Sequence, residues 1–266
     1  MTTASSGADA APDPFVDYYE KQSITPETMA RFRQVFDLVL AFRQRRGLPV
    51  ERLAMLDIGC NAGTQAFIWA AAGHAVRGLD INEPLLEIAR RRGHEQGFSI
   101  DFQAGTATAL PWPAASIDVC LMPELLEHIA DWQACLREAA RVLRPGGTLY
   151  LSTTNRLCPR QLEFNLPAYG WYPAPLKRHF ERLAVTSRPD LVNFATYPAV
   201  NWFTPYQLRR QLGALGFSAW DHFDCIGTAG RSAMAKLAIA AIRALPPLRW
   251  LAHVMTPYSM VVAERR

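Results

Sequence analysis

The stretch Leu56-Asp57-Ile58-Gly59-Cys60-Asn61-Ala62-Gly63-Thr64 decides the fold of this 266-residue chain. Its apolar beginning continues a run that starts at Leu53, and its end carries two glycines separated by three residues. A short apolar run that enters a glycine-bearing loop is typical of a buried strand that turns directly into a helix. Glycine lets the loop backbone approach a ligand closely, and the N-terminus of the next helix offers free N–H groups. The stretch therefore predicts a strand–loop–helix unit that contacts a ligand.

Outward from this loop, strand patterns alternate with helical patterns. Strands are predicted at 53–58, 75–80, 99–103, 117–122 and 148–152 and from 217 onward; helices are predicted at 26–46, 64–72, 83–92, 132–143 and 205–215; a turn is predicted at 144–147. Thr25 is the predicted N-cap of the first helix. Strands separated by helices imply a parallel sheet with helices on both faces, so we expect a doubly wound α/β fold.

Composition and charge argue against several classes of protein. The chain is 50% hydrophobic and 20% charged, as in ordinary globular proteins. A net charge of +4 without a long basic run gives no reason to expect a nucleic-acid partner. Five cysteines without a C-x-x-C pair argue against a disulfide framework or a zinc site. We find neither the pattern of a signal peptide nor an apolar run approaching the ~20 residues of a membrane span, and expect a cytoplasmic protein.

The chain divides into five parts on these patterns. They are a disordered tail at 1–14, a helical segment at 15–50, a ligand-binding core at 51–155, an insertion at 156–203 and the C-terminal part of the core at 204–266. The insertion is rich in aromatic residues and prolines, and it leaves the sheet at the edge where open α/β sheets bind ligands. We expect it to form a lid over an acceptor; the alternative is a structural extension that only pads the core.

Two pairs of aromatic residues in the insertion receive separate predictions. Trp171 and Tyr172 are expected to form walls of the acceptor pocket, because Gly170 and Pro173 fix their backbone. Trp202 and Phe203 are expected to anchor the lid to the core.

Five motifs then occur in order along the core. They are Leu56-Asp57-Ile58-Gly59-Cys60-Asn61-Ala62-Gly63-Thr64, Gly78-Leu79-Asp80, Ala109-Leu110-Pro111-Trp112, Ile117-Asp118-Val119 and Leu143-Arg144-Pro145-Gly146-Gly147. In this order they resemble class I methyltransferases that use S-adenosylmethionine (SAM), from about residue 52 to residue 155. The resemblance implies a Rossmann-like, mostly parallel seven-stranded sheet and SAM as cofactor. It also implies that Asp57 orients the loop and the methionine amine, and that Asp80 binds the ribose hydroxyls.

The resemblance extends to a set of cofactor-binding positions. They are Asp57, Gly59, Cys60, Asn61, Gly63, Asp80, Ile81, Thr106, Ala107, Met122 and Pro123. Asn61 stands where the family usually has glycine, and asparagine tolerates the left-handed backbone better than most residues. Thr106 and Ala107 lie where the family often has an aspartate near adenine. We expect the methionine carboxylate to meet a cation of the N-terminal helix, and prefer Arg33 to Arg31 because Arg33 is nearer the apolar stripe.

The sequence Glu124-Leu125-Leu126-Glu127-His128 follows the fourth predicted strand, and helical spacing places its two acids and its histidine on one face. With Ser152-Thr153-Thr154-Asn155 it resembles the O-methyltransferases of ubiquinone biosynthesis, in which the corresponding residues are assigned to a divalent metal. Three interpretations stay open. Glu124, Glu127 and His128 bind a metal, or His128 with Glu127 beside it acts as a general base, or the residues only orient the loop.

The expected function is transfer of a methyl group from SAM to a small-molecule acceptor, at an aromatic or lipophilic hydroxyl. The alternatives are C- or N-methylation, a sugar or polysaccharide acceptor, and a SAM-binding assembly partner without catalysis. The sequence leaves the oligomeric state open. It also leaves two interpretations of 231–254, packing on the domain or peripheral contact with a membrane. Its apolar positions are Ala233, Leu237, Ala240, Ala241 and Ala244, with Arg231, Lys236 and Arg243 nearby.

Overall fold

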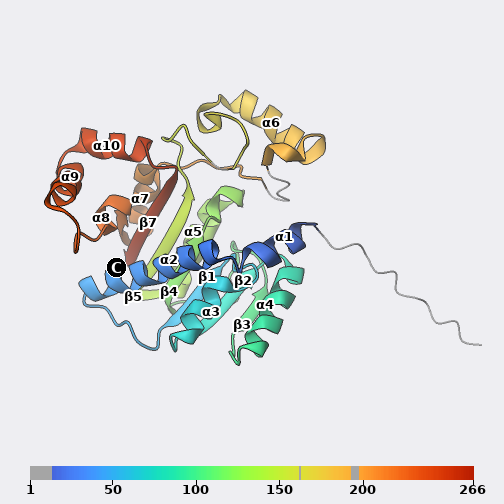
Figure 1. Cartoon of the computed structure of the whole chain (residues 1–266). Helices are drawn as coiled ribbons and strands as arrows, with labels where there is room; N and C mark the ends of the chain where they lie inside the picture. The colour runs from blue at the N-terminus through green and yellow to red at the C-terminus, as the bar shows by residue number, and fades with distance from the viewer. Residues whose placement is uncertain (1–13, 162, 193–197) are drawn as a thin grey trace, which may run out of the picture.

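The computed structural model describes residues 14–161, 163–192 and 198–266. Its centre is a seven-stranded sheet with the order β3-β2-β1-β4-β5-β7-β6 (Figure 1). The strands are β1 (Ala54–Ile58), β2 (Ala75–Asp80), β3 (Asp101–Ala104), β4 (Ile117–Pro123), β5 (Leu143–Thr154), β6 (Phe217–Asp221) and β7 (Tyr258–Arg265). Strands β1 to β5 pair in parallel, whereas β7 runs antiparallel to both β5 and β6. The predicted mostly parallel, doubly wound α/β fold is confirmed.

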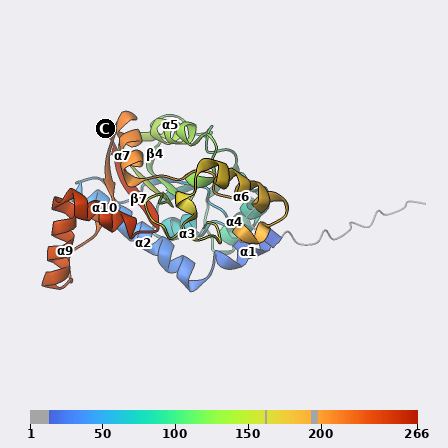
Figure 2. The same cartoon turned by 90° about the horizontal axis from the view of Figure 1, so that it is seen from above.

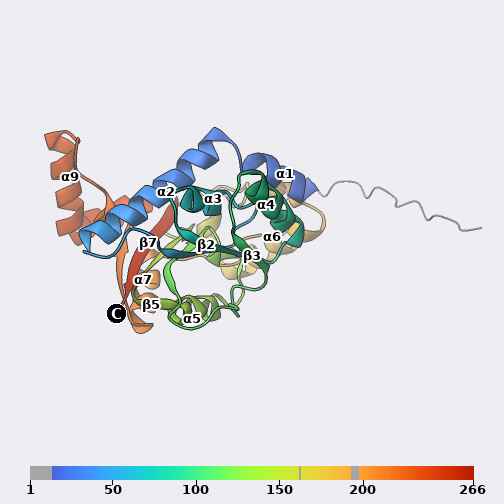
Figure 3. The ribbon, with the colours of Figure 1, turned by 90° about the horizontal axis from the view of Figure 1, so that it is seen from below.

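Helices cover both faces of the sheet, as Figures 2 and 3 show from above and from below. The α-helices are α1 (Pro14–Gln22), α2 (Pro26–Arg45), α3 (Thr64–Ala71), α4 (Glu83–Glu95), α5 (Trp132–Val142), α6 (Ala174–Thr186), α7 (Pro205–Ala214), α8 (His222–Cys225), α9 (Ala233–Ala244) and α10 (Pro246–Val254). Three short 3-10 helices are η1 (Leu126–His128), η2 (Tyr169–Trp171) and η3 (Pro189–Val192). Of the tail predicted at 1–14, residues 1–13 lie outside the described residues and Pro14 begins α1.

Two hydrophobic clusters fill the space between the sheet and its helices. One contains residues of α5 and α7, and the other contains residues of α2 and α3. Strand β5 contributes to both, since Leu149 and Leu151 belong to the first cluster and Tyr150 to the second. This alternation follows from the two-residue period of a strand. It explains why β5 reads as a continuous apolar run and is buried on both faces.

Most of the predicted elements of the core are present within a few residues of their predicted ends. Thr25 caps α2, accepting a hydrogen bond from the backbone N–H of Thr28. The turn predicted at 144–147 is instead an irregularity inside β5, because Leu143 already pairs with Ile117 while Thr148 pairs with Val119. Gly146 has a φ of 75°, which lets the extra residues bulge out of the pairing.

The insertion at 156–203 folds over the carboxyl end of the parallel strands, where Figure 1 shows α6. Its described part has a small hydrophobic cluster of its own around Phe164 and Tyr169, whose rings stack 4.0 Å apart. Phe203 is buried in the main core against Trp132, as predicted for an anchor. Trp202 packs instead on Tyr169 within the insertion. The base of the insertion is therefore fixed to the core through Phe203.

Candidate cofactor and acceptor site

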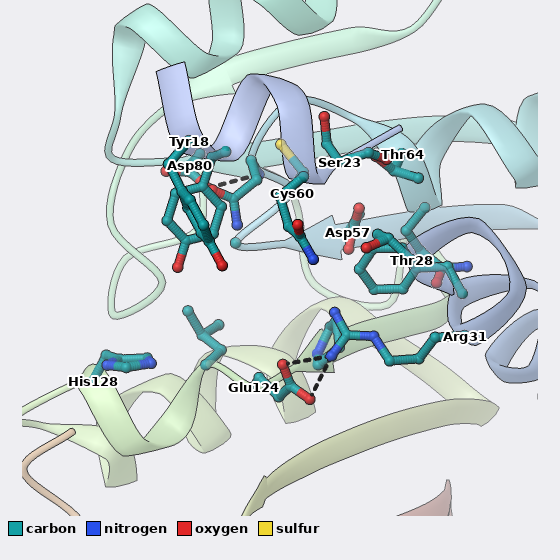
Figure 4. Close-up of a pocket in the computed structure, with 18 of the residues that line it drawn as sticks. Tyr18, Ser23, Thr28, Arg31, Asp57, Cys60, Thr64, Asp80, Glu124 and His128 are labelled. Carbon is teal, nitrogen blue, oxygen red and sulfur yellow. Dashed lines mark hydrogen bonds and ion pairs between the residues drawn. The ribbon is translucent and has the colours of Figure 1, made fainter. Parts of the chain in front are cut away.

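A cavity of about 530 Å³ lies at the carboxyl edge of the sheet. One wall is formed by the loop between β1 and α3, and another by the residues that follow β4 (Figure 4). Helix α1 and the start of α2 close a third side, and Glu163, Val192 and Pro198 reach the cavity from the insertion. This is the place where open α/β sheets bind ligands.

The loop of the first wall has the backbone that was expected from its sequence. Gly59 and Asn61 have φ angles of 77° and 48°, so Asn61 adopts the left-handed conformation in place of a glycine. The N–H of Asn61 donates to Asp80 Oδ2 at 2.8 Å, and the N–H of Asn82 donates to Oδ1 at 2.9 Å. Asp80 thereby fixes the loop and keeps lone pairs that face the cavity.

Two buried polar side chains on this wall have atoms without a hydrogen-bond partner among the described residues. They are Asp57, through both carboxylate oxygens, and Gln65, through both amide atoms. Burial, with Asp80 nearby, raises the pKa of Asp57 to about 7. Buried polar groups are almost always hydrogen-bonded, so these atoms indicate a polar ligand. A cation beside Asp57 would favour its ionised form, and the amine of SAM fits that requirement.

Arg31 and Glu124 form the opposite side of the cavity (Figure 4). Arg31 Nη1 lies 2.9 Å from both carboxylate oxygens of Glu124. Arg33, the cation preferred from the sequence, does not line the cavity; it pairs with Asp37 and lies over the ring of Phe36. Of the two arginines, Arg31 is thus the one that lines the cavity. Positions two apart differ by about 200° around a helix, so Arg31 and Arg33 point to different sides of α2.

The acids of the Glu124-x-x-Glu127-His128 motif lie in different environments. Helix η1 contains Glu127 and His128 but not Glu124, whose φ is 50°. The Glu127 carboxylate is 1% exposed and does not line the cavity; it accepts the hydroxyl of Thr153 at 2.7 Å. Burial raises the pKa of Glu127 to about 8. His128 lines the cavity (Figure 4).

The three residues thus do not converge as metal ligands. Within 14–161, 163–192 and 198–266, the structure shows no group of three histidine, cysteine or acidic side chains that could hold a metal. The expectation of a shared helical face is wrong, because the backbone turns at Glu124 before η1 begins.

Several predicted cofactor positions lie outside this cavity. Met122 is buried behind the wall, where it contacts Cys135, and Ala107 is buried in the core. Ile81 and Thr106 are exposed and do not line it. Gly63 caps α3 with a φ of 83°. The predicted residues Asp57, Gly59, Cys60, Asn61, Asp80 and Pro123 all line the cavity.

The predicted aromatic walls are also elsewhere. Trp171 is 57% exposed, and its indole N–H donates to the carbonyl oxygens of Arg156 and Leu157. Tyr172 packs with Tyr169 in the cluster of the insertion. Neither ring lines the cavity.

Sequence reasoning missed several residues that line the cavity, among them Tyr18, Tyr19, Gln65 and Glu163. Burial, with Glu124 nearby, raises the pKa of Glu163 to about 7. Gln65 had a recognisable signal, a polar side chain in the first turn of the helix that follows the glycine loop. The tyrosines and Glu163 had none, because their approach to the loop depends on how α1 and the insertion fold back.

Comparison with known proteins agrees with this geometry. Residues 56–151 match the family model described as methyltransferase domain. The ubiquinone biosynthesis O-methyltransferase of Methylocella silvestris is 39% identical over 176 residues, which cover 65% of this chain and 61% of that protein. The enzyme of the same name from Parvibaculum lavamentivorans is 33% identical over 144 residues, covering 54% of this chain and 57% of that protein. The chain thus matches little more than half of the length of these relatives.

Solved structures share the fold at low sequence identity. A SAM-dependent methyltransferase from Mesorhizobium loti has a TM-score of 0.53 and 22% identity, covering 83% of this chain and 95% of its own. Magnesium protoporphyrin IX methyltransferase from Synechocystis, with bound S-adenosylhomocysteine (SAH), has a TM-score of 0.51 and 17% identity, covering 97% and 90%. The cyclase SpnF has a TM-score of 0.53 and 20% identity, covering 87% and 80%. These likenesses show the fold.

Proposed function

We propose that the chain transfers the methyl group of SAM to a small-molecule acceptor, at an aromatic or lipophilic hydroxyl, because residues 56–151 match the methyltransferase domain model on a Rossmann-like sheet. One observation carries the proposal. A single cavity joins the glycine loop, with the unpartnered polar atoms of Asp57 and Gln65, to His128 beyond β4. The name O-methyltransferase of the curated relatives supports a hydroxyl acceptor.

The methionine portion and the ribose of SAM have matching groups on the cavity wall. Asp57 suits the amine, Arg31 suits the methionine carboxylate, and Asp80 suits the ribose hydroxyls. The exposed residues Ile81 and Thr106 remain the proposed neighbours of adenine, whereas Ala107 and Met122 are buried. SAM would supply a methyl group already activated on a sulfonium.

The protein then has to align the acceptor, exclude water and remove a proton. Alignment is the largest of these contributions, up to about 7–11 kcal/mol in well-oriented systems. A phenol of pKa about 10 needs a base near it at neutral pH, and His128 is the residue placed for that role. Glu127 acts as a positioning residue, because its main-chain carbonyl accepts the N–H groups of Val200 and Asn201 and so ties the insertion to the loop that carries His128.

Other acceptors and a protein without turnover are the competing hypotheses. C- or N-methylation and a sugar acceptor would use the same cofactor-binding residues, so only the compound that is methylated distinguishes these hypotheses. Among the matching structures, SpnF is a cyclase, which illustrates that the fold also serves other chemistry. We place the protein in the cytoplasm, where its five buried free cysteines suit a reducing compartment.

The decisive test has two parts. Calorimetry with SAH should give binding that Asp80→Ala weakens by about 1.5–3 kcal/mol, or roughly 10- to 150-fold. Asp80→Asn, which keeps one acceptor oxygen for the loop, serves as the control for loop structure. Incubation with methyl-labelled SAM and a panel of phenols, amines and sugars should then label a hydroxyl compound. Unchanged SAH affinity in Asp80→Ala would contradict the cofactor assignment, and binding without labelling of any acceptor would favour the protein without turnover.

A further inference from the structure

Helices α9 and α10 carry an apolar surface that nothing in the described chain covers. In the chain they follow β6 and precede β7. Helix α9 extends outward beyond this edge of the sheet (Figures 1 and 3). The exposed fractions of Met234, Leu237 and Met255 are 83%, 71% and 77%. Leu245, Leu248, Trp250 and Leu251 are exposed as well. We call these seven residues the arm surface.

Helix α9 is amphipathic and hardly buried, because its two charged residues are seven positions apart and share one face while its other positions are apolar. Its charged residues are Lys236 and Arg243, and in this fully described helix Ile239 is the single buried residue. A basic amphipathic helix whose apolar face stays exposed is typical of a segment that lies at a membrane surface. Packing on the domain, the competing interpretation of 231–254, therefore accounts for Ile239 but not for the arm surface.

The arm surface has a fixed orientation because the opposite side of α10 is held by a buried polar network. Arg249 Nη2 lies 2.6 Å from Asp221 Oδ2 and from Asp224 Oδ2. The buried His253 ring lies 3.3 Å from Asp221, and the main-chain carbonyl of His253 accepts the amide of Asn155. The network locks one side of α10 onto the end of β6, so Trp250 and Leu251 are held toward solvent. A preformed surface of this kind loses little conformational entropy on binding.

The charge around the arm surface has one sign. From residue 226 to residue 263 the chain contains no aspartate or glutamate, but it contains Arg231, Lys236, Arg243 and Arg249. Arg249 is neutralised by its two acids. Arg231 and Arg243 donate to main-chain carbonyls, which leaves their positive charge in place. The arm surface is thus bordered by cations, and its natural complement is apolar and anionic.

We propose that α9 and α10 dock on the surface of an anionic lipid bilayer. The arm surface would enter the boundary between headgroups and acyl chains, while Arg231, Lys236 and Arg243 would meet lipid phosphates. Trp250 has the amphipathic ring that favours this boundary. In the part of the chain that the structure describes, no helix is long and apolar enough to cross the bilayer, so the contact is peripheral.

Docking would also orient the candidate site. Figures 1 and 2 show α10 and α6 at the same end of the sheet, the end where the cavity lies. A docked arm brings this end toward the bilayer, from which a lipophilic acceptor can be taken up. Only this consequence rests on the proposed function; the docking itself does not.

Vesicle flotation of the full chain tests the proposal. The protein should float with vesicles of phosphatidylcholine mixed with phosphatidylglycerol, float far less with phosphatidylcholine alone, and be released by added salt. The double variant Met234→Ser/Leu237→Ser should reduce partitioning roughly tenfold. Lys236→Glu should reduce it about fivefold or more. Ile24→Ser, at a residue 62% exposed in the turn between α1 and α2, is the matched apolar control, and Arg137→Glu on α5 is the matched charge control.

The substituted side chains are exposed, so the variants should unfold at the wild-type temperature. Wild-type protein that stays unbound with anionic vesicles would overturn the proposal, as would equal binding to both vesicle types. Sedimentation that shows a dimer dissolved by Met234→Ser/Leu237→Ser, without flotation, would assign the arm surface to a second copy and also overturn it.

Discussion

The ion pair between Arg31 and Glu124 predicts that substitutions of its two partners change the affinity for the cofactor in opposite directions. Both side chains line the cavity, and Arg31 Nη1 contacts the two oxygens of Glu124 at 2.9 Å. A methionine carboxylate of SAM bound at Arg31 would compete with Glu124 for the same guanidinium. Removing Arg31 should therefore weaken cofactor binding, whereas neutralising Glu124 should strengthen it.

The geometry sets the size of both effects. The two side chains are 53% and 51% exposed, and ion pairs at that exposure contribute about 0.2–1 kcal/mol. A charge-assisted hydrogen bond from Arg31 to the ligand contributes about 1.5–3 kcal/mol. Arg31→Met loses that bond but no longer has to break the ion pair, so we expect a net loss of roughly 1–2 kcal/mol, or about 5- to 30-fold in Kd. Glu124→Gln should gain up to about fivefold.

Calorimetry with two ligands separates this mechanism from a structural effect. SAH carries the carboxylate, whereas methylthioadenosine lacks the whole amino-acid portion and should bind wild type and Arg31→Met alike. Arg33→Met is the matched control, since Arg33 lies outside the cavity and pairs with Asp37. An equal loss for both ligands, or an equal loss in the two arginine variants, would refute the assignment of Arg31 to the carboxylate.

Three further predictions concern protons. Burial raises the pKa of Asp57 to about 7, so SAH affinity should rise as pH rises through 7 and the carboxylate ionises beside the amine. Asp57→Asn should abolish this dependence of SAH affinity on pH, as measured by calorimetry. Burial raises the pKa of Glu127 from 4.5 to about 8, so the stability that its protonated form contributes is complete below pH 4.5 and is lost as pH rises through 8. Glu127→Gln should remove the pH dependence of the melting temperature in this window. An unchanged pH profile in that variant would contradict the burial argument. His128→Ala should lower kcat about 10²- to 10⁴-fold at unchanged SAH affinity, and full turnover would exclude it as the base.

The sequence predicted those features whose physical cause is local. The loop from Gly59 to Gly63 and the left-handed Asn61 follow from glycine spacing and from the backbone tolerance of asparagine. Strand β2 has its predicted bounds, because its apolar run is closed by an acid and a helix cap. These signals need no knowledge of the rest of the chain.

The features that the sequence did not predict depend on how distant segments meet. Arg31 was passed over for Arg33 because a helical stripe shows which side faces the sheet but not which end overhangs the cavity. Trp171 and Tyr172 carried a strong compositional signal, yet Trp171 is exposed and Tyr172 packs in the cluster of the insertion. Glu163 reaches the cavity from the same insertion without any local pattern. Composition alone therefore could not distinguish a cavity wall from the small core of a lid.

The Glu124-x-x-Glu127-His128 motif also illustrates how one run of polar residues can divide its tasks. Glu124 and His128 both line the cavity, where Glu124 pairs with Arg31. The Glu127 side chain is buried away from the cavity and accepts a hydrogen bond from the Thr153 hydroxyl. Its main-chain carbonyl accepts hydrogen bonds from two N–H groups of the insertion. Such a division requires a sharp turn after β4, which the positive φ of Glu124 provides. Because the main-chain carbonyl of Glu127 accepts the N–H groups of Val200 and Asn201, the insertion is hydrogen-bonded to the loop that carries His128.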